Sequence, residues 1–253
     1  MYNIMNNSIT GMSANQGKID IISNNIANSQ TVGYKKLESD FLDLYTESLS
    51  RQAYPTNSDN LIIGTGVKLS DASRNLSQGA LRETGIKTNI SIEGDGFFRV
   101  ISKDGSYKYT RNGEFNFDSN GRIVDNYGNI LDITYNNSIS SNEINLSNGD
   151  LSINNEGNLF LNGEDIGRIT LYMPQGNHDF ISVGDNLFST NEGSKIYSVD
   201  NPKIRQGYVE ISNVNLGMEM TDLIMAQRAY QINSRGIKAI DEMWSMINNL
   251  KGK

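Results

Sequence analysis

The sequence has no cysteine, three prolines and one histidine among its 253 residues. Without cysteine the chain forms no disulfide, holds no metal through thiolates and has no Cys nucleophile. The histidine, His178, lies in the polar segment PQGNHDF, and catalysis there would need a nucleophile and an orienting acid. The chain contains no G-x-S-x-G nucleophile elbow. We therefore expect no enzyme activity, no catalytic or metal-binding residues and no cofactor.

Long apolar runs and basic clusters are missing too. No segment approaches the ~20 apolar residues needed to span a bilayer. The opening MYNIMNNSITGM has neither the basic region nor the continuous apolar stretch of a secretory signal peptide. The net charge is −7, whereas nucleic-acid binding needs grouped Lys and Arg. We expect no membrane insertion, no nucleic-acid partner and no export by the general secretory route.

Helical periodicity is present at both ends of the chain. Apolar residues recur at spacings of three, four or seven within residues 1–28, on a stripe interrupted by Gln16, and again within residues 214–250. Asn215 is the predicted N-cap of the second helix. Gly33, in NSQTVGY, is expected to take positive φ where the first helix ends. The two predicted stripes consist of Met5, Ile9, Met12, Ile19, Ile22 and Ile26, and of Met220, Leu223, Tyr230, Ile237, Ile240, Trp244 and Ile247.

The centre of the chain favours β structure. Alternating apolar and polar residues are bounded by KDGS, by Asn112-Gly113 and by Asn-x-Gly turns, which are typical of hairpins. The segment GDGFF (94–98) predicts a tight turn into a core strand led by Phe97 and Phe98, because its glycines do not fit a nucleotide-binding loop. The predicted class is α+β, with a mainly-β central module of irregular hairpins between N- and C-terminal amphipathic helices.

This pattern divides the chain into three parts. We expect a discontinuous helical domain from residues 1–33 and 206–253, an extended connector over 34–75 and a β-rich module over 76–205. The apolar stripes leave two packings open for the helices. They form either a hairpin within one chain or contacts between copies of the chain.

Three motifs, occurring in order, resemble those of the bacterial flagellar rod and hook proteins. The first is TGMSANQGKIDIISNNIANSQTVGYKK, near the N-terminus, and the second is IEGDGFFRV with YTRNGEFNFDSNGRIV. The third is GYVEISNVNLGMEMTDLIMAQRAYQINSRGIKAIDEM, near the C-terminus. The residues that match the two terminal signatures are Asn24, Asn25, Ala27, Asn28, Thr31, Gly33, Tyr34, Ser212, Asn213, Val214, Gln227, Arg228, Ala229, Tyr230 and Asn233.

The resemblance implies a structural protein of the flagellar basal body. In that family the terminal helices of neighbouring subunits pack as a coiled coil into a helical tube, with the β module outside. The tube transmits torque and encloses the export channel. The implied partners are further copies of the chain, other flagellar rod and hook proteins, and the flagellar type III export apparatus, which exports subunits without a cleaved signal peptide.

Within the family, the stretch IGTGVKLSDASRNLSQGALRETG (63–85) resembles that of distal rod subunits. A proximal rod subunit is the alternative within the same family. A secreted β-rich module that binds the cell wall is an alternative of a different class. A distal rod subunit would lie in the basal body, in the periplasm or the cell-wall space.

Overall fold

The computed structural model describes residues 2–44, 46–48, 62–136, 146, 149–176, 180–190 and 194–251, and His178 lies outside them. The described residues form two compact units. One, the helical unit, contains residues 1–27, 37–73 and 215–253; the other, the β unit, contains residues 28–36 and 74–214. Of the segment predicted as a connector, the described residues between 37 and 73 belong to the helical unit, and residues 34–36, 74 and 75 belong to the β unit.

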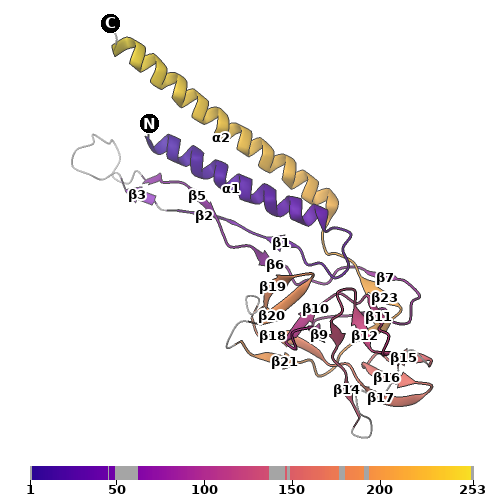
Figure 1. Ribbon diagram of the computed structural model, residues 1–253. Helices are drawn as coiled ribbons and strands as arrows, with labels where there is room; N and C mark the ends of the chain where they lie inside the picture. The colour runs from indigo at the N-terminus through magenta and orange to yellow at the C-terminus, as the bar shows by residue number, and fades with distance from the viewer. Residues whose placement is uncertain are drawn as a thin grey trace. The chain divides into compact units, whose positions relative to one another are not determined.

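The helical unit consists of two long antiparallel helices and a β ribbon (Figure 1). α1 spans Tyr2–Ala27 and α2 spans Leu216–Lys251, so the helices predicted at both ends are confirmed. Strands β2 and β5 form an antiparallel ribbon that contacts α1, and β3 and β4 continue that ribbon. The strands of this unit are β1 (Leu37–Glu38), β2 (Phe41–Asp43), β3 (Thr46–Ser48), β4 (Ile62–Gly64) and β5 (Val67–Leu69), and β6 (Ser73–Arg74) spans the boundary.

Local sequence explains where α2 begins but only weakly supports α1. The predicted N-cap is confirmed, because the Met218 amide donates to Asn215 Oδ1 over 3.2 Å and the Glu219 amide donates to the Asn215 carbonyl over 3.0 Å. α1 has no acidic residue in its first turn and no basic residue in its last. It is rich in Asn and Ser, which are poor helix formers. We infer that α1 depends on tertiary packing.

The β unit contains an antiparallel nine-stranded sheet and a four-stranded sheet. In the larger sheet the order is β11-β12-β13-β9-β10-β20-β19, with β18 beside β9 and β21 beside β18; in the smaller it is β14-β17-β16-β15. Strand pairs β7–β23 and β8–β22 join its early part to its late part. The strands are β7 (Leu81–Glu83), β8 (Ile90–Ile92), β9 (Phe97–Ile101), β10 (Tyr107–Thr110), β11 (Phe115–Phe117), β12 (Ile123–Asp125), β13 (Ile130–Leu131), β14 (Thr134–Tyr135), β15 (Leu151–Ile153), β16 (Asn158–Leu161), β17 (Glu164–Arg168), β18 (Leu171–Pro174), β19 (Phe180–Gly184), β20 (Leu187–Thr190), β21 (Ile196–Ser198), β22 (Ile204–Gln206) and β23 (Tyr208–Glu210).

The side chains of strand β9 point alternately to the two faces of the sheet, and each face carries its own apolar cluster. Phe98 and Val100 point into the main core, whereas Phe97 points into an aromatic cluster on the opposite face of the sheet. Tyr109, Phe180 and Phe188 complete that second cluster, and the Phe97 and Phe180 rings meet edge to face with centroids 4.9 Å apart. The prediction that GDGFF leads into a core strand is confirmed.

Several predicted turns are confirmed, but Asn112-Gly113 does not form a hairpin. β9 and β10 pair across KDGS, and β11 and β12 pair across DSNG, where Gly121 has φ 74°. β10 and β11 do not pair with each other. The Ile90 amide instead donates to the Gly113 carbonyl over 3.0 Å. A Cβ at Gly113 would lie 1.6 Å from the Ile90 carbonyl oxygen, so this glycine permits a close backbone approach.

The positive φ predicted for Gly33 is confirmed, at 69°. The Gly33 amide donates to the Glu210 carbonyl over 2.8 Å. A Cβ at Gly33 would lie 2.5 Å from the Asn112 amide nitrogen, so a side chain there meets backbone as well as an unfavourable φ. Gly85 has nearly the same φ, 68°, but a Cβ there would meet nothing within 4 Å.

We predict that Gly33→Ala lowers the free energy of unfolding of the β unit by more than Gly85→Ala does. Both substitutions place a Cβ in the left-handed region, which costs about 1–3 kcal/mol. Only the Cβ at residue 33 also clashes with backbone. Urea unfolding followed by near-UV circular dichroism measures both losses. Equal losses would show that the contact between residues 33 and 112 is unimportant.

Candidate assembly surface and signature motifs

The α1–α2 seam is built from small and polar residues. A Cβ at Gly11 would lie 2.7 Å from Asn233 Nδ2, and a Cβ at Gly236 would lie 3.2 Å from Ser8 Oγ. Ala14 and Ala226 are buried, with exposed fractions of 4% and 7%. Residues without bulky side chains therefore let the two helices approach closely at these positions.

The predicted stripe residues differ in how far α1 and α2 bury them. Ile22 and Ile240 are buried. The half-buried members are Met5, Met12, Ile19, Ile26, Leu223, Tyr230 and Ile237, and the exposed members are Ile9, Met220, Trp244 and Ile247. Figure 1 shows α2 extending past the first turn of α1. Trp244 lines a groove together with Met5 of α1.

α2 carries a second apolar line that the sequence analysis did not identify. It consists of residues spaced seven apart, and we call it the outer stripe: Met218, Met225, Ile232, Ala239 and Met246. All five side chains are exposed, and Ile232 reaches 67%. Ile224, also on α2, is 59% exposed. A sustained spacing of seven is typical of a seam packed against another helix.

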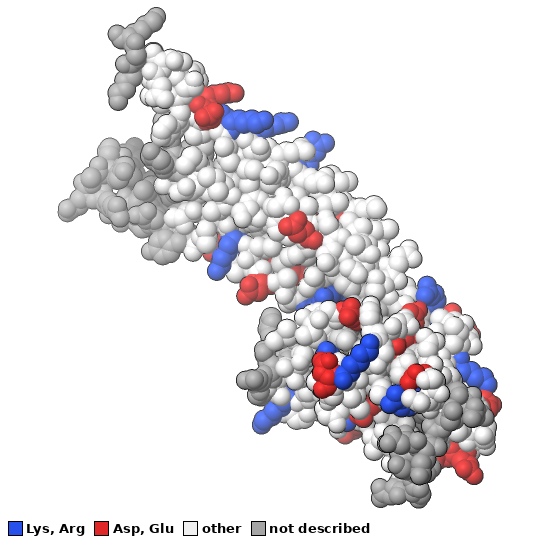
Figure 2. All heavy atoms as spheres, in the orientation of Figure 1, with Lys and Arg blue, Asp and Glu red and all other residues white. Residues whose placement is uncertain are grey.

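Two grooves open on the helical unit. One, of about 330 Å³, is lined by Asn15, Lys18, Phe41, Met225 and Ala229 among others. The second, of about 390 Å³, is lined by Met5, Ile237, Lys238, Ile240, Asp241 and Trp244 and is mostly apolar. Figure 2 shows few charged side chains over the visible face of this unit. The helical unit thus presents both apolar ridges and apolar grooves.

The signature residue Asn25 joins three segments of the helical unit. Its side chain is fully buried and donates to the Leu37 carbonyl over 2.9 Å and to Glu219 Oε2 over 3.1 Å. The Leu37 amide donates back to Asn25 Oδ1 over 2.9 Å. Glu219, on α2, is 1% exposed. Asn25 therefore holds β1 against α1 and binds α2 as well. Its neighbour Asn24 is exposed.

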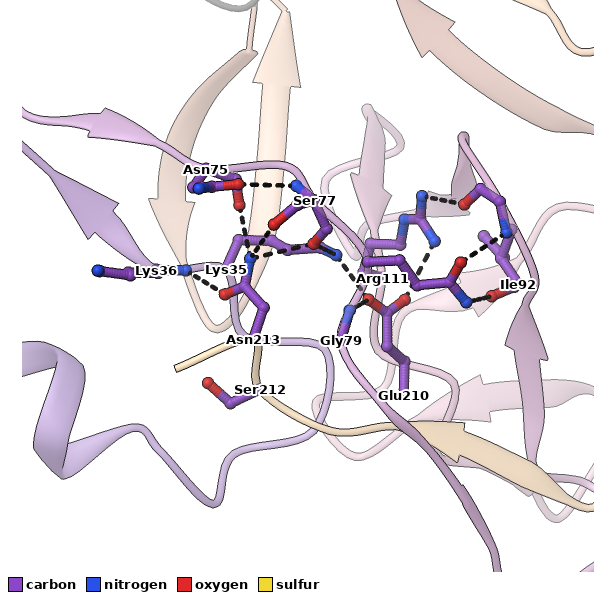
Figure 3. A network of polar contacts seen from close by, with 12 residues as sticks. Lys35, Lys36, Asn75, Ser77, Gly79, Ile92, Arg111, Glu210, Ser212 and Asn213 are labelled. Carbon is purple, nitrogen blue, oxygen red and sulfur yellow. Dashed lines mark hydrogen bonds and ion pairs between the residues drawn. The ribbon is translucent and has the colours of Figure 1, made fainter. Parts of the chain in front are cut away.

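In the β unit, Glu210 is the centre of a buried ion network (Figure 3). Lys35 Nζ donates to Glu210 Oε1 over 2.6 Å, and Arg111 Nη1 donates to Oε2 over 3.0 Å. The Gly79 amide also donates to Oε1, over 2.7 Å. The side chains of Lys35, Glu210 and Arg111 are at most 2% exposed. One carboxylate thus holds two cations from distant parts of the chain.

Burial dominates the electrostatics of this network. Desolvation lowers the pKa of Lys35 below its ordinary value, and the nearby Arg111 lowers it further, while Glu210 acts in the opposite direction. Desolvation also lowers the pKa of Arg111, again opposed by Glu210. The two charged donors are therefore stable here only beside the carboxylate.

Beside this network lies the signature residue Asn213, which bonds to other segments of the β unit. Its Oδ1 accepts from the Lys36 amide over 2.8 Å, and its Nδ2 donates to the carbonyls of Asn75 and Ser77 over 2.9 and 3.0 Å (Figure 3). Tyr34 is buried, and the Arg74 guanidinium lies 5.0 Å from its ring centroid. The exit of the first helix and the approach to the second are thus joined within the β unit.

The remaining signature residues lie either next to the ends of the two helices or on the helices themselves. Ser212 is buried, and its Oγ accepts from the Val214 amide over 3.3 Å. The Thr31 hydroxyl donates to Asn28 Oδ1 over 3.2 Å. On α2, Ala229, Tyr230 and Asn233 are half-buried, and Gln227 and Arg228 are exposed, as is Ala27 on α1.

Sequence reasoning missed Glu210 and Arg111. Glu210 lies in the strand segment YVEIS and Arg111 directly follows the strand YKYT, and a charge in or beside a buried strand is a signal of a buried ion pair. Nothing in the sequence indicates that the two charges meet across 99 positions.

The described residues show no site for a metal ion and no membrane span. No group of three or more His, Cys, Asp and Glu side chains in the described ranges could hold a metal ion. Neither helix, over the residues that the structure covers, is long and apolar enough to cross a bilayer.

We predict that Glu210→Gln lowers the free energy of unfolding of the β unit by about 3–5 kcal/mol, because it leaves two buried cations without a counter-charge. The matched control is Glu93→Gln, which breaks the exposed pair between Glu93 and Arg205, whose ions are 2.6 Å apart. An exposed pair contributes at most about 1 kcal/mol. Urea unfolding measures both variants. Losses of similar size would contradict a structural role for the buried network.

We further predict that Asn25→Asp weakens the helical unit far more than Asn24→Asp. The new carboxylate at residue 25 cannot donate to the Leu37 carbonyl and would face Glu219 in a buried position. Thermal loss of the helical circular dichroism signal measures the effect. If both variants lose this signal at the same temperature, the buried Asn25 amide does not stabilise the helical unit.

Comparison with known proteins gives consistent matches along the chain. Residues 5–35 match the family profile described as flagella basal body rod protein, residues 91–161 match the flagellar hook protein FlgE/F/G D1 domain, and residues 205–250 match the flagellar basal body rod FlgEFG protein C-terminal profile.

Three relatives that align with nearly the whole chain are flagellar basal-body rod proteins named FlgG. The flagellar basal-body rod protein FlgG of Agrobacterium fabrum is 37% identical over 96% of this chain and 97% of its own length. That of Borreliella burgdorferi is 34% identical over 96% of both chains, and that of Bacillus subtilis is 31% identical over 99% of this chain. The hook protein FlgE of Helicobacter mustelae matches 49% of this chain and 28% of its own length. This chain belongs to the family of flagellar basal-body rod proteins.

Proposed function

We propose that this protein is a structural subunit of the bacterial flagellar rod, in its distal part. It polymerises through its terminal helices into a helical tube that transmits torque and encloses the export channel. Each of the three predicted parts of the chain has its own role in this proposal. The segments 1–33 and 206–253 serve polymerisation, 34–75 connects and 76–205 forms the outer module.

The observation that carries this proposal is the apolar surface left on α2. α1 packs on α2 along one seam, and the outer stripe stays exposed on α2, together with Ile224. Burying large apolar side chains contributes about 1.5–3 kcal/mol for each. Exposed apolar patches of this kind mark sites of protein association.

The occupant that fits this surface best is a second copy of the chain. Ridges at a spacing of seven on α2 can pack into grooves of a neighbouring helix pair, and the helical unit presents two grooves. α1 carries only two charged residues, Lys18 and Asp20, so little repulsion opposes the packing of one helix pair on another. The terminal helices then pack as a coiled coil between subunits.

Relatives of the same length favour the rod over the other functions. The chain aligns almost end to end with proteins named FlgG, whereas it covers about a quarter of the hook protein. A proximal rod subunit is the closer alternative, and a secreted module that binds the cell wall is not favoured. The proposal includes a location in the basal body, export through the flagellar type III apparatus without a cleaved signal peptide, and contacts with other rod and hook proteins.

We predict that Ile232→Asp abolishes polymerisation and leaves the subunit folded. The side chain is 67% exposed in the subunit, so the carboxylate costs little there, but burial against a neighbour would leave it unpaired. Gln231→Asp is the matched control, because it adds the same charge one residue away, off the outer stripe. Sedimentation and electron microscopy measure polymer, and circular dichroism checks the fold.

Normal polymer from Ile232→Asp would contradict a role for the outer stripe. Loss of polymer in both variants would indicate a general effect of charge rather than a defined packing surface. Motility of cells that carry each variant in place of the natural protein gives a second measurement, with loss expected for Ile232→Asp alone.

A further inference from the structure

The methionines of this chain are concentrated on α2. The chain has nine methionines and no cysteine. More than half of them lie on α2, with exposed fractions from 38% to 61%: Met218, Met220, Met225, Met243 and Met246. Three of these, Met218, Met225 and Met246, are members of the outer stripe. A surface that must become dry on assembly is thus built largely from thioethers.

Thioethers are the side chains of this chain that peroxide attacks most readily, since there is no thiol to compete. A sulfur lone pair attacks one oxygen of hydrogen peroxide, the O–O bond breaks, and a sulfoxide and water form. The sulfur loses two electrons and the peroxide gains them. The product is a polar, chiral group in place of a flexible apolar one.

We propose that the outer stripe is an oxidation-sensitive assembly surface, with Met218, Met225 and Met246 as the modification sites. This inference rests on the proposed function. Peroxide reaches these sulfurs in the free subunit, and the sulfoxides block packing, because a buried sulfoxide oxygen without a donor carries a desolvation cost. Packing in the polymer shields the same sulfurs. Oxidised subunits are therefore excluded from growth, while assembled subunits resist oxidation.

The chain offers a matched control in its other unit. Met173, on β18, is 43% exposed and so is open to the same reagent. It lies in the β unit, outside the helices. Its oxidation should change the mass of the protein without changing its ability to polymerise. Ile232, between Met225 and Met246 on the stripe, does not react with peroxide.

The test treats purified full-length chain with hydrogen peroxide, removes the reagent and starts polymerisation. Peptide mass spectrometry locates the sulfoxides, and sedimentation measures polymer. We expect at least tenfold less polymer from the oxidised natural protein. The triple variant Met218→Leu, Met225→Leu, Met246→Leu should polymerise after the same treatment, and Met173→Leu should remain as sensitive as the natural protein. Treatment with methionine sulfoxide reductases should restore polymer.

Each outcome bears on one claim. If untreated protein forms no polymer, the proposed function fails. If untreated and oxidised protein polymerise equally, with sulfoxides present at the three sites, only the present inference is overturned. It is also overturned if the triple variant polymerises before but not after peroxide. If the untreated triple variant does not polymerise, the reductase experiment on the oxidised natural protein tests the inference instead. Failure of the reductases to restore polymer would then contradict the inference.

Discussion

The central constraint on this molecule is that α2 has more apolar faces than α1 can cover. α1 meets α2 along one seam, where Gly11 and Gly236 let the two helices approach closely. The outer stripe remains exposed, as do Trp244 and Ile247 near the end of α2. A helix with apolar surface on several sides requires several partners. The apolar surface of the subunit is therefore incompletely buried, and we propose that association with other copies removes the remainder from water.

The two signature motifs have different physical roles in the two units. In the helical unit, Asn25 satisfies both backbone groups of Leu37 and reaches Glu219. In the β unit, Glu210 collects Lys35, Arg111 and the Gly79 amide in a site with almost no exposure to solvent. The network requires residues from the early, middle and late parts of the chain. It therefore forms only after nearly the whole chain is present.

Much of the fold could be predicted from local chemistry. Helix periodicity gave both helices, Asn215 gave the start of α2, and the turns with glycine in the left-handed region gave the β9–β10 and β11–β12 hairpins. Asn112-Gly113 misled the prediction, because this glycine serves a close approach to Ile90 rather than a tight turn. The partners of Glu210 could not be predicted, since sequence spacing carries no information on which buried charges meet. Periodicity also missed the outer stripe, because several registers on α2 are apolar and only the packing of α1 distinguishes the covered register from the exposed one.

Copies of the chain are proposed to meet through α2, and a single measurement tests this most directly. Electron cryomicroscopy of polymer grown from the purified chain would show which surfaces lie between subunits. We expect Met218, Met225 and Ile232 to contact helices of neighbouring copies, and the ends of α2 to line the inside of a tube. A polymer in which copies meet only through their β units, with the outer stripe of α2 facing solvent, would contradict the account.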